Sequence, residues 1–168
     1  ILETMGRDTG WLAASACTAK LNNKPVADFI YLPEVAFDKD KFLKDVKKRF
    51  EENNKVYIIA SEGLRDKNGK FVSEFECISQ DNFGHAQLGG VSGYLRNLIL
   101  DANITTRVKA LELGILQRCA MHCASDTDLI EAYTVGEMAL RYAYEGETGK
   151  MVTIKRECDS PYKVSYSL

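Results

Sequence analysis

The sequence lacks long hydrophobic runs, a strong net charge and a secretion signal. No apolar run approaches the roughly 18 residues of a membrane span, and residues 1–20 lack the charged and then apolar layout of a signal peptide. The 22 basic and 24 acidic residues give a net charge of -2, which argues against a dedicated nucleic-acid or membrane surface. We therefore expect a cytoplasmic protein that binds a small anion.

The five cysteines are an odd number and lack the spacing of a disulfide scaffold, so reduced thiols are expected. Cys119, His122 and Cys123 have one-turn helical spacing and could hold a soft metal ion if a fourth ligand approached. No second pair of ligands occurs elsewhere in the sequence, so we interpret these cysteines as buried thiols and predict no metal site.

The length suits one domain with one hydrophobic core, because 45% of the 168 residues are hydrophobic. No internal repeat, low-complexity tract or linker is present in the sequence. The chain opens on Ile1 with residues that already resemble a strand, and we expect it to be a portion of a longer protein.

Hydrophobic periodicity predicts alternating strands and helices. The expected strands are residues 1–4, 29–32, 56–60, 108–115 and 150–156. The expected helices begin after Gly10, Asp38, Gly90 and Ser125, with Asp38 and Ser125 as caps. This order predicts a three-layer α/β/α fold with a mostly parallel sheet of about four strands.

Two further stretches carry local signals. Trp11 and the small apolar residues after it predict a helix packed tightly against the sheet, with Trp11 in the core. The segment 65–90 contains Asn68-Gly69 and an alternating stretch, which predicts a loop or a short hairpin.

Ligands of such sheets bind beyond the carboxyl ends of the strands. The residues at the predicted ends are Met5, Gly6 and Arg7, then Ser61, Glu62 and Gly63, and finally Gln117 and Arg118. Two arginines and a carboxylate beside a glycine turn suit a phosphorylated polyol, because guanidinium groups match phosphate oxygens and a carboxylate accepts from hydroxyls.

Five motifs then resemble those of the phosphofructokinases. They are MGRDTGWLA at 5–13, LPEVAF at 32–37, SEG at 61–63, FGHAQLGGVSGYL at 83–95 and LQR at 116–118. Any one of them is weak alone, but five in the family's order over about 120 residues are specific. The resemblance implies a phosphofructokinase-like substrate domain.

The resemblance assigns a role to the first two strand ends. Met5, Gly6 and Arg7 would lie along fructose 6-phosphate, and Arg7 would also stabilise charge on the transferring phosphoryl group. Glu62 would accept hydrogen bonds from the sugar hydroxyls. Arg7 is therefore the catalytic residue that the resemblance implies within this chain.

The third strand end is assigned in the same way. Ile115 opens the motif whose last residue, Arg118, would hold the 6-phosphate. Lys109 falls where the family places a basic residue that reaches into the site of a neighbouring subunit, which implies a homo-oligomer.

The motif also bears on the phosphoryl donor. Ile115 stands where many ATP-dependent members have histidine, and Cys119 stands where they have glycine, so the chain resembles the pyrophosphate-dependent branch. Residues 51–54 lack the lysines with which bacterial ATP-dependent members bind an effector, so we expect no such allosteric site.

The family's glycine-rich donor loops and aspartate-bearing catalytic motif precede MGR, and nothing in this sequence corresponds to them. The resemblance implies that residues 1–168 are a single domain, the C-terminal fructose 6-phosphate-binding portion of a larger 6-phosphofructokinase. That enzyme would transfer a phosphoryl group from pyrophosphate to O1 of fructose 6-phosphate in glycolysis, with Mg²⁺ bound mostly outside this chain. The isolated chain is expected to be inactive.

Two alternatives stay open for the function. The donor could be ATP, or the chain could be a non-catalytic module for sugar-phosphate binding or oligomerisation. Individual residues also have structural interpretations: an ion pair between Arg7 and Glu62, a surface lysine at Lys109, a structural histidine at His85 and a turn or interface residue at Glu34.

Overall fold

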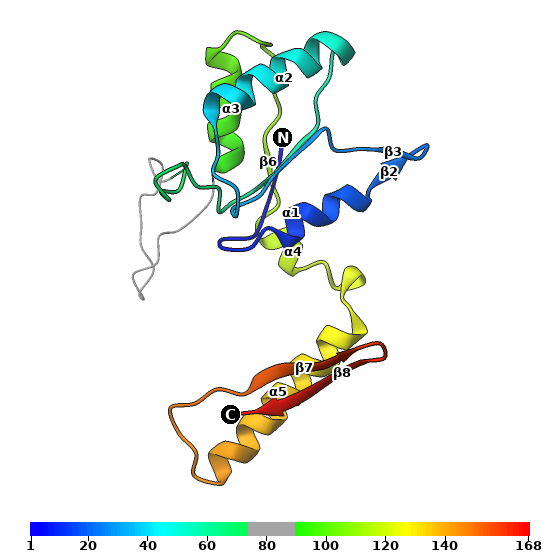
Figure 1. Ribbon diagram of the computed structural model, residues 1–168, viewed down its shortest axis with the longest axis vertical. Helices are drawn as coiled ribbons and strands as arrows, with labels where there is room; N and C mark the ends of the chain where they lie inside the picture. Colours follow the sequence, from blue (N-terminus) through cyan, green and yellow to red (C-terminus); the bar gives the residue numbers. More distant parts are fainter. Residues whose placement is uncertain (74–89) are drawn as a thin grey trace. The chain divides into compact units, whose positions relative to one another are not determined.

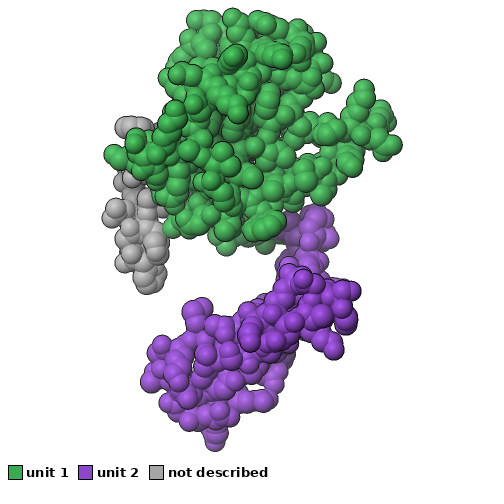
Figure 2. Space-filling model, viewed as in Figure 1, with its two compact units in different colours: residues 1–119 green, residues 120–168 purple. Residues whose placement is uncertain are grey.

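The structure is a computed structural model that describes residues 1–73 and 90–168. The described residues form two compact units, residues 1–119 and residues 120–168, coloured green and purple in Figure 2. The single domain expected over residues 1–168 stays a prediction. Among the helices of the described residues, none has the length and apolarity that crossing a membrane requires.

Four short strands form the main sheet of the first unit (Figure 1). In spatial order they are β4 (Phe29–Tyr31), β5 (Ile58–Ser61), β1 (Leu2–Thr4) and β6 (Leu111–Glu112). All three pairings are parallel. The predicted α/β class with a parallel sheet of about four strands is therefore confirmed.

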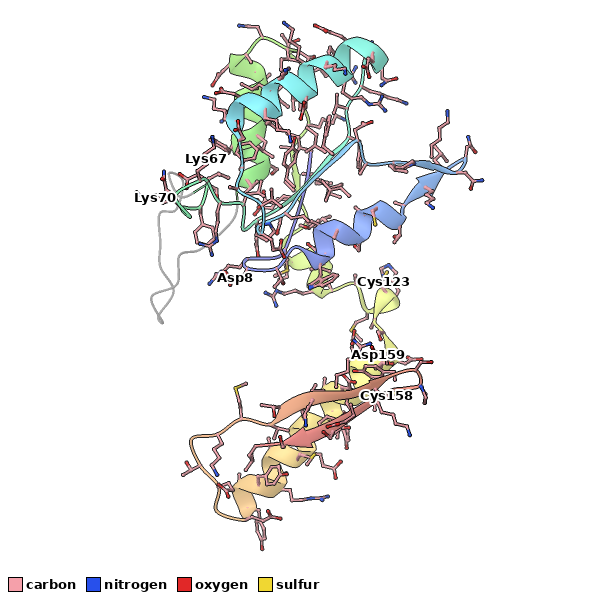
Figure 3. The ribbon with its side chains drawn as sticks, in the orientation of Figure 1. Asp8, Lys67, Lys70, Cys123, Cys158 and Asp159 are labelled. Carbon is pink, nitrogen blue, oxygen red and sulfur yellow. The ribbon has the colours of Figure 1, made fainter. Side chains whose placement is uncertain are left out.

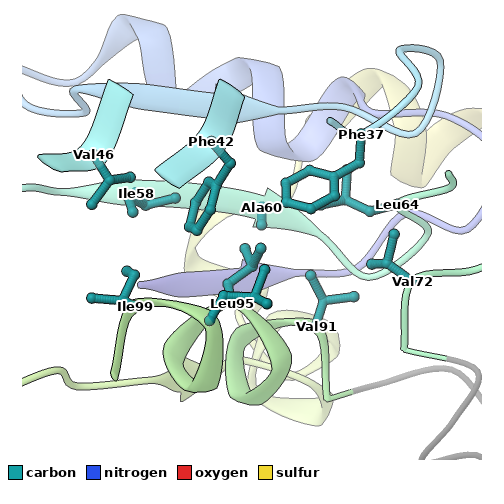
Figure 4. Close-up of a cluster of buried hydrophobic side chains, with 11 residues drawn as sticks. Phe37, Phe42, Val46, Ile58, Ala60, Leu64, Val72, Val91, Leu95 and Ile99 are labelled. Carbon is teal, nitrogen blue, oxygen red and sulfur yellow. The ribbon is translucent and has the colours of Figure 1, made fainter. Parts of the chain in front are cut away.

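Two helices cover one face of this sheet. Phe42 and Val46 come from α2 (Lys39–Asn53), Leu95 comes from α3 (Val91–Asp101), and they share a buried cluster with Ile58 and Ala60 of β5 (Figure 4). Because alternate strand residues point to opposite faces, both helices pack on the face of Ile58 and Ala60. The apolar spacing of each helix therefore produced its buried side as predicted.

The ends of these helices also follow the sequence. The Asp38 side chain accepts hydrogen bonds from the backbone N–H groups of Asp40 and Lys41 at the start of α2. The pKa of Asp38 is lowered, chiefly by the hydrogen bond from Lys41, because these bonds favour the carboxylate. Asn54 ends α2 in the left-handed conformation with φ of 53°, which suits a C-terminal cap.

The helix predicted after Gly10 is present, but the expected length and the burial of Trp11 were wrong. The helix α1 covers only Trp11–Ser15, and the single-turn 3₁₀ helix η1 (Ala16–Thr18) follows it. Ala13 is the buried residue of α1, whereas Trp11 is 80% exposed rather than part of the core. A helix this short presents little more than one residue to the sheet, and Trp11 lies two positions before Ala13, on another side of the helix.

A hairpin that the sequence analysis missed follows α1. Its strands are β2 (Lys20–Leu21) and β3 (Lys24–Pro25), which pair antiparallel. Asn22 and Asn23 connect them with φ of 51° and 60°. Two central residues with positive φ are typical of a type I′ turn, in which asparagine is favoured, so the Asn-Asn pair was the available signal.

The predicted strand over residues 108–115 was also wrong in extent. The strand β6 contains only Leu111 and Glu112, and residues Ile115–Arg118 form the one-turn helix α4. Gly114 separates them with φ of 45° and ψ of -125°. A glycine in this conformation ends the extended segment, which apolar alternation alone cannot indicate.

The predicted loop or hairpin at 65–90 is described only in its first part. Arg65 and Phe71 form an isolated antiparallel bridge, and the Arg65 guanidinium lies 3.9 Å from the centre of the Phe71 ring. Gly69 turns the chain with φ of 78°, and Asp66 accepts from the backbone of Asn68 and Lys70. His85 lies outside the described residues.

The second unit contains one long helix and one hairpin. The helix α5 (Asp126–Tyr144) is capped by the Ser125 side chain, which accepts from Asp128, so the predicted cap is confirmed. The single-turn 3₁₀ helix η3 (Met121–Cys123) precedes it. The last expected strand is β7 (Thr153–Asp159), but it pairs antiparallel with β8 (Tyr162–Ser167) instead of joining the parallel sheet.

Candidate functional site

The three predicted strand ends lie side by side at one edge of the sheet. β1 is the centre of the group, because it pairs with β5 on one side and with β6 on the other. Since all three strands are parallel, the residues that follow them leave the sheet at the same edge. Residues 5–7, residues 62–63 and the helix α4 therefore surround one region of the first unit.

The loop after β1 is tied to the end of β5. The Gly6 N–H donates to Oε1 of Glu62 at 3.1 Å, and the Ser61 hydroxyl donates to the Gly6 carbonyl oxygen at 2.5 Å. The same carbonyl accepts from the Gly63 N–H at 3.2 Å. Gly6 is thus fixed through both of its backbone groups, and Glu62 is held beside it.

Glycine is required at two positions of this contact. Gly6 has φ of 138°, and a Cβ atom there would lie 2.6 Å from the Thr9 carbonyl oxygen and 2.7 Å from the Ser61 hydroxyl oxygen. A Cβ atom at Gly63 would overlap the carbonyl oxygen of Arg7. The two glycines of the MGR and SEG motifs therefore let two backbone segments approach closely, which places half-buried Arg7 next to the end of β5.

The helix α4 is tied to the same loop from the other side. The Met5 N–H donates to Oε1 of Gln117 at 2.7 Å. Arg118, the residue after Gln117, is exposed at the end of α4, and Ile115 is 72% exposed at its beginning. The structure thus brings the Arg118 motif to the loop that carries Arg7.

Two more contacts hold the segment between the loop and α1. The Gly10 N–H donates to Oε1 of Glu34 at 2.7 Å, so the LPEVAF motif contacts the start of α1. Asp8, labelled in Figure 3 on the turn after β1, forms an ion pair of 2.9 Å with Arg65. The Asp8–Arg65 pair was not predicted from the sequence, since 57 residues separate the partners and no local pattern connects them.

A buried carboxyl group lies under the site. Glu3 of β1 is 2% exposed, and its Oε2 accepts from the Ser92 N–H in the first turn of α3 at 2.7 Å. Burial raises the pKa of Glu3; the Ser92 hydrogen bond opposes this effect, and the negative charges of Glu112 and Glu62 add to it. The neutral form of Glu3 is therefore favoured more than that of a carboxyl group in water.

Lys109 lies away from the other predicted site residues. Its carbonyl oxygen accepts from the amino group of Ile1 at 2.8 Å, at the point where β1 begins, whereas residues 5–7 follow the end of β1. Lys109 and Arg7 therefore lie at opposite edges of the sheet. The predicted role of Lys109 in a neighbouring subunit stays a prediction.

The cysteine prediction was wrong about burial. Cys119 and Cys123 are exposed, as are Cys17 and Cys158, and all four thiols are free. Within residues 1–73 and 90–168, no group of three or more His, Cys, Asp or Glu side chains is placed to hold a metal ion. A short irregular segment with a 3₁₀ turn carries Cys119 and Cys123, so their helical spacing does not create a buried face.

The pattern of the family described as Phosphofructokinase matches residues 1–142. This match includes every residue of the strand-end site described above.

Individual relatives cover nearly the whole chain. The pyrophosphate--fructose 6-phosphate 1-phosphotransferases of Xanthomonas campestris pv. campestris and Methylococcus capsulatus are 40% and 37% identical to it, over 97% of its length in each case. The chain spans 38% of the length of each of these relatives. The crystal structure of a pyrophosphate-dependent phosphofructokinase from Marinobacter aquaeolei covers 99% of this chain with a TM-score of 0.64 and 29% identity, over 37% of its own length.

Proposed function

Because the chain belongs to the phosphofructokinase family, we propose that it forms the fructose 6-phosphate side of an enzyme that transfers a phosphoryl group from pyrophosphate to this sugar phosphate. The observation that carries the proposal is the meeting of three motifs at one edge of the sheet. There the Met5 N–H donates to Gln117 and the Gly6 N–H donates to Glu62. The similarity to relatives named for the pyrophosphate reaction supports the choice of donor.

The residues at this edge suit the two ends of the sugar phosphate. Arg118 is exposed and carries a planar guanidinium group that can bind the 6-phosphate through two hydrogen bonds. Glu62 uses Oε1 for the Gly6 N–H, and its second oxygen can accept from a sugar hydroxyl. Arg7 follows Gly6 directly and would stabilise the charge that develops on the transferring phosphoryl group.

The reaction forms a bond between O1 of fructose 6-phosphate and the transferred phosphorus and breaks the bridging P–O bond of pyrophosphate. Inorganic phosphate leaves, and the proton of the 1-hydroxyl passes to a base that lies outside this chain. The family resemblance implies that Mg²⁺ is bound mostly by residues outside this chain. We assign to this chain the binding and orientation of the sugar phosphate, and the isolated chain should bind it without turnover.

A coupled assay tests the proposal. The full-length protein that carries this chain is supplied with Mg²⁺, fructose 6-phosphate and pyrophosphate as the sole donor, and fructose 1,6-bisphosphate is measured. Formation of the bisphosphate with release of phosphate supports the proposal. Activity with ATP alone would keep the sugar site and overturn the donor, whereas binding of fructose 6-phosphate without turnover by either donor would favour the non-catalytic module.

A further inference from the structure

Gln117 joins two parts of the site that are far apart in the sequence. Its Oε1 accepts from the Met5 N–H at 2.7 Å across a separation of 112 residues. Met5 begins the loop that carries Arg7, and Gln117 directly precedes Arg118. The hydrogen bond is half-buried, so its two groups are partly removed from competing water.

The helix α4 needs such a contact. It has four residues, and no side chain caps its N-terminus. A helix of one turn has little stability of its own, since nucleation is unfavourable and few hydrogen bonds follow it. It also follows Gly114, whose positive φ lets the chain turn sharply after β6. Contacts outside the helix must therefore fix its orientation.

The orientation of α4 determines the direction of Arg118. Successive residues of a helix are about 100° apart around its axis. Because the Gln117 side chain is held at the Met5 N–H, the side chain of Arg118 leaves the helix in a direction about 100° around the axis from this contact. Loss of the hydrogen bond would free α4 to rotate, and Arg118 would no longer be held in a fixed direction relative to Met5 and Arg7.

We propose that Gln117 is a positioning residue for fructose 6-phosphate, acting through Arg118 by locking α4 to the Met5 backbone. The inference rests on the proposed function, since it names a further determinant of the same site. It assigns Gln117 no contact with the substrate. Its effect on affinity therefore exists only while Arg118 is present.

A double-mutant cycle tests this dependence in the full-length protein. The variants are Gln117→Met, which removes the acceptor at similar volume, Arg118→Met, and both together. The KM for fructose 6-phosphate should rise about tenfold in Gln117→Met and about a hundredfold in Arg118→Met, because a neutral hydrogen bond contributes less than a charged one. The double variant should stay within about twofold of Arg118→Met, since coupled residues are not additive.

Three controls separate positioning from general destabilisation. Cys119→Ser changes an exposed side chain just after α4 and should leave the KM for fructose 6-phosphate within about twofold of wild type. The KM for the phosphoryl donor should not change in Gln117→Met, and the assays are run well below the thermal unfolding midpoint of each variant. If Gln117→Met does not fold, Gln117→Asn serves instead, because its amide is one methylene too short to reach Met5.

The outcomes are distinct. If the KM of the double variant rises by the product of the two single-variant increases, Gln117 acts independently of Arg118, and the inference is overturned. An unchanged KM in Gln117→Met with an active wild-type enzyme would overturn it as well. A wild-type protein that neither binds nor converts fructose 6-phosphate would overturn the proposed function and this inference with it.

Discussion

The carbonyl oxygen of Arg7 lies so close to Gly63 that no side-chain carbon fits at residue 63. The loop after β1 and the end of β5 are therefore in direct backbone contact, and the Gly63 N–H donates to the Gly6 carbonyl oxygen at 3.2 Å in the same place. A side chain at residue 63 must push the two segments apart. The position of Arg7 relative to Glu62 thus depends on an absent Cβ atom.

Gly63→Ala should displace the Arg7 loop. We expect the KM for fructose 6-phosphate to rise at least about tenfold and the thermal unfolding midpoint to fall, because the overlap involves backbone that cannot rotate away. Gly93→Ala is the matched control, since a Cβ atom at Gly93 in α3 would have no atom of the described residues within 4 Å. A Gly63→Ala enzyme with the kinetics and melting of the Gly93→Ala enzyme would contradict this explanation.

Glu62 should act through both of its oxygens. Glu62→Gln keeps one acceptor oxygen for the Gly6 N–H but replaces the other with a donor, so we expect the KM for fructose 6-phosphate to rise about tenfold with unchanged stability. Glu62→Ala also removes the acceptor from Gly6, and it should lower the melting temperature in addition. Steady-state kinetics and calorimetry measure both effects.

Glu51→Gln supplies the control for Glu62. Glu51 is an exposed carboxylate near the end of α2, and its substitution makes the same change of net charge away from the sheet edge. Equal kinetics for Glu51→Gln and Glu62→Gln would mean that Glu62 does not contact the sugar.

Arg7→Lys should separate charge from geometry. Lysine keeps the positive charge but lacks the planar fork of donors, so we expect kcat to fall about a hundredfold, the size of the loss when one preorganised donor to a transition state is removed. The KM for fructose 6-phosphate should change less than kcat. Arg96→Lys, at an exposed position of α3, should leave kcat unaltered. If kcat of Arg7→Lys stays within twofold of wild type, Arg7 does not stabilise the transition state.

The sequence predicted those parts of the fold that depend on local pattern. The spacing of Leu95, Leu98 and Ile99 indicated the buried side of α3, and all three are buried. Asp38 caps α2 because its side chain accepts hydrogen bonds from N–H groups in the first turn of the helix, and an aspartate before an amphipathic segment is a local signal for such a cap. The edge of the sheet that carries the candidate site followed from the parallel order of the strands alone.

Apart from the Asn22-Asn23 hairpin, which had a local signal, the missed parts include features that depend on tertiary contacts or on backbone pairing. Trp11 is apolar and has small neighbours, but whether a five-residue helix buries it depends on which side meets the sheet. The alternation from Val108 to Ile115 continues past the point where pairing with β1 ends, because side-chain pattern does not record hydrogen bonding. The bond between Gln117 and Met5 has no sequence signal, since neither residue's neighbours indicate the other.

The buried Glu3 should make the free energy of unfolding fall as the pH rises, which is opposite to the effect of a carboxyl group whose pKa is lowered by folding. Its pKa in the folded protein is raised above the ordinary value of 4.5. Between these two pKa values the folded state keeps a proton that the unfolded chain has released, so the free energy of unfolding falls as the pH rises through this window. The contribution of Glu3 is therefore present below the unfolded pKa of 4.5 and is lost as the pH rises through the raised pKa of the folded protein.

Glu3→Gln removes this titration, and urea unfolding of residues 1–168 at pH 5 and pH 8 measures the consequence. Relative to wild type, the variant should be more stable at pH 8 than at pH 5. The gain is at most about 1.4 kcal/mol for each pH unit that separates the folded and unfolded pKa of Glu3, because the unfolded group already begins to ionise below pH 5. The gain comes from wild type, which must ionise a group that is 2% exposed, whereas glutamine stays neutral and keeps an acceptor for the Ser92 N–H. For Glu51→Gln, at an exposed site, the difference in free energy of unfolding from wild type should be the same at both pH values. A constant difference between Glu3→Gln and wild type across this range would mean that Glu3 ionises normally in the folded protein, and the cost of its burial would then have to be offset by groups other than Ser92.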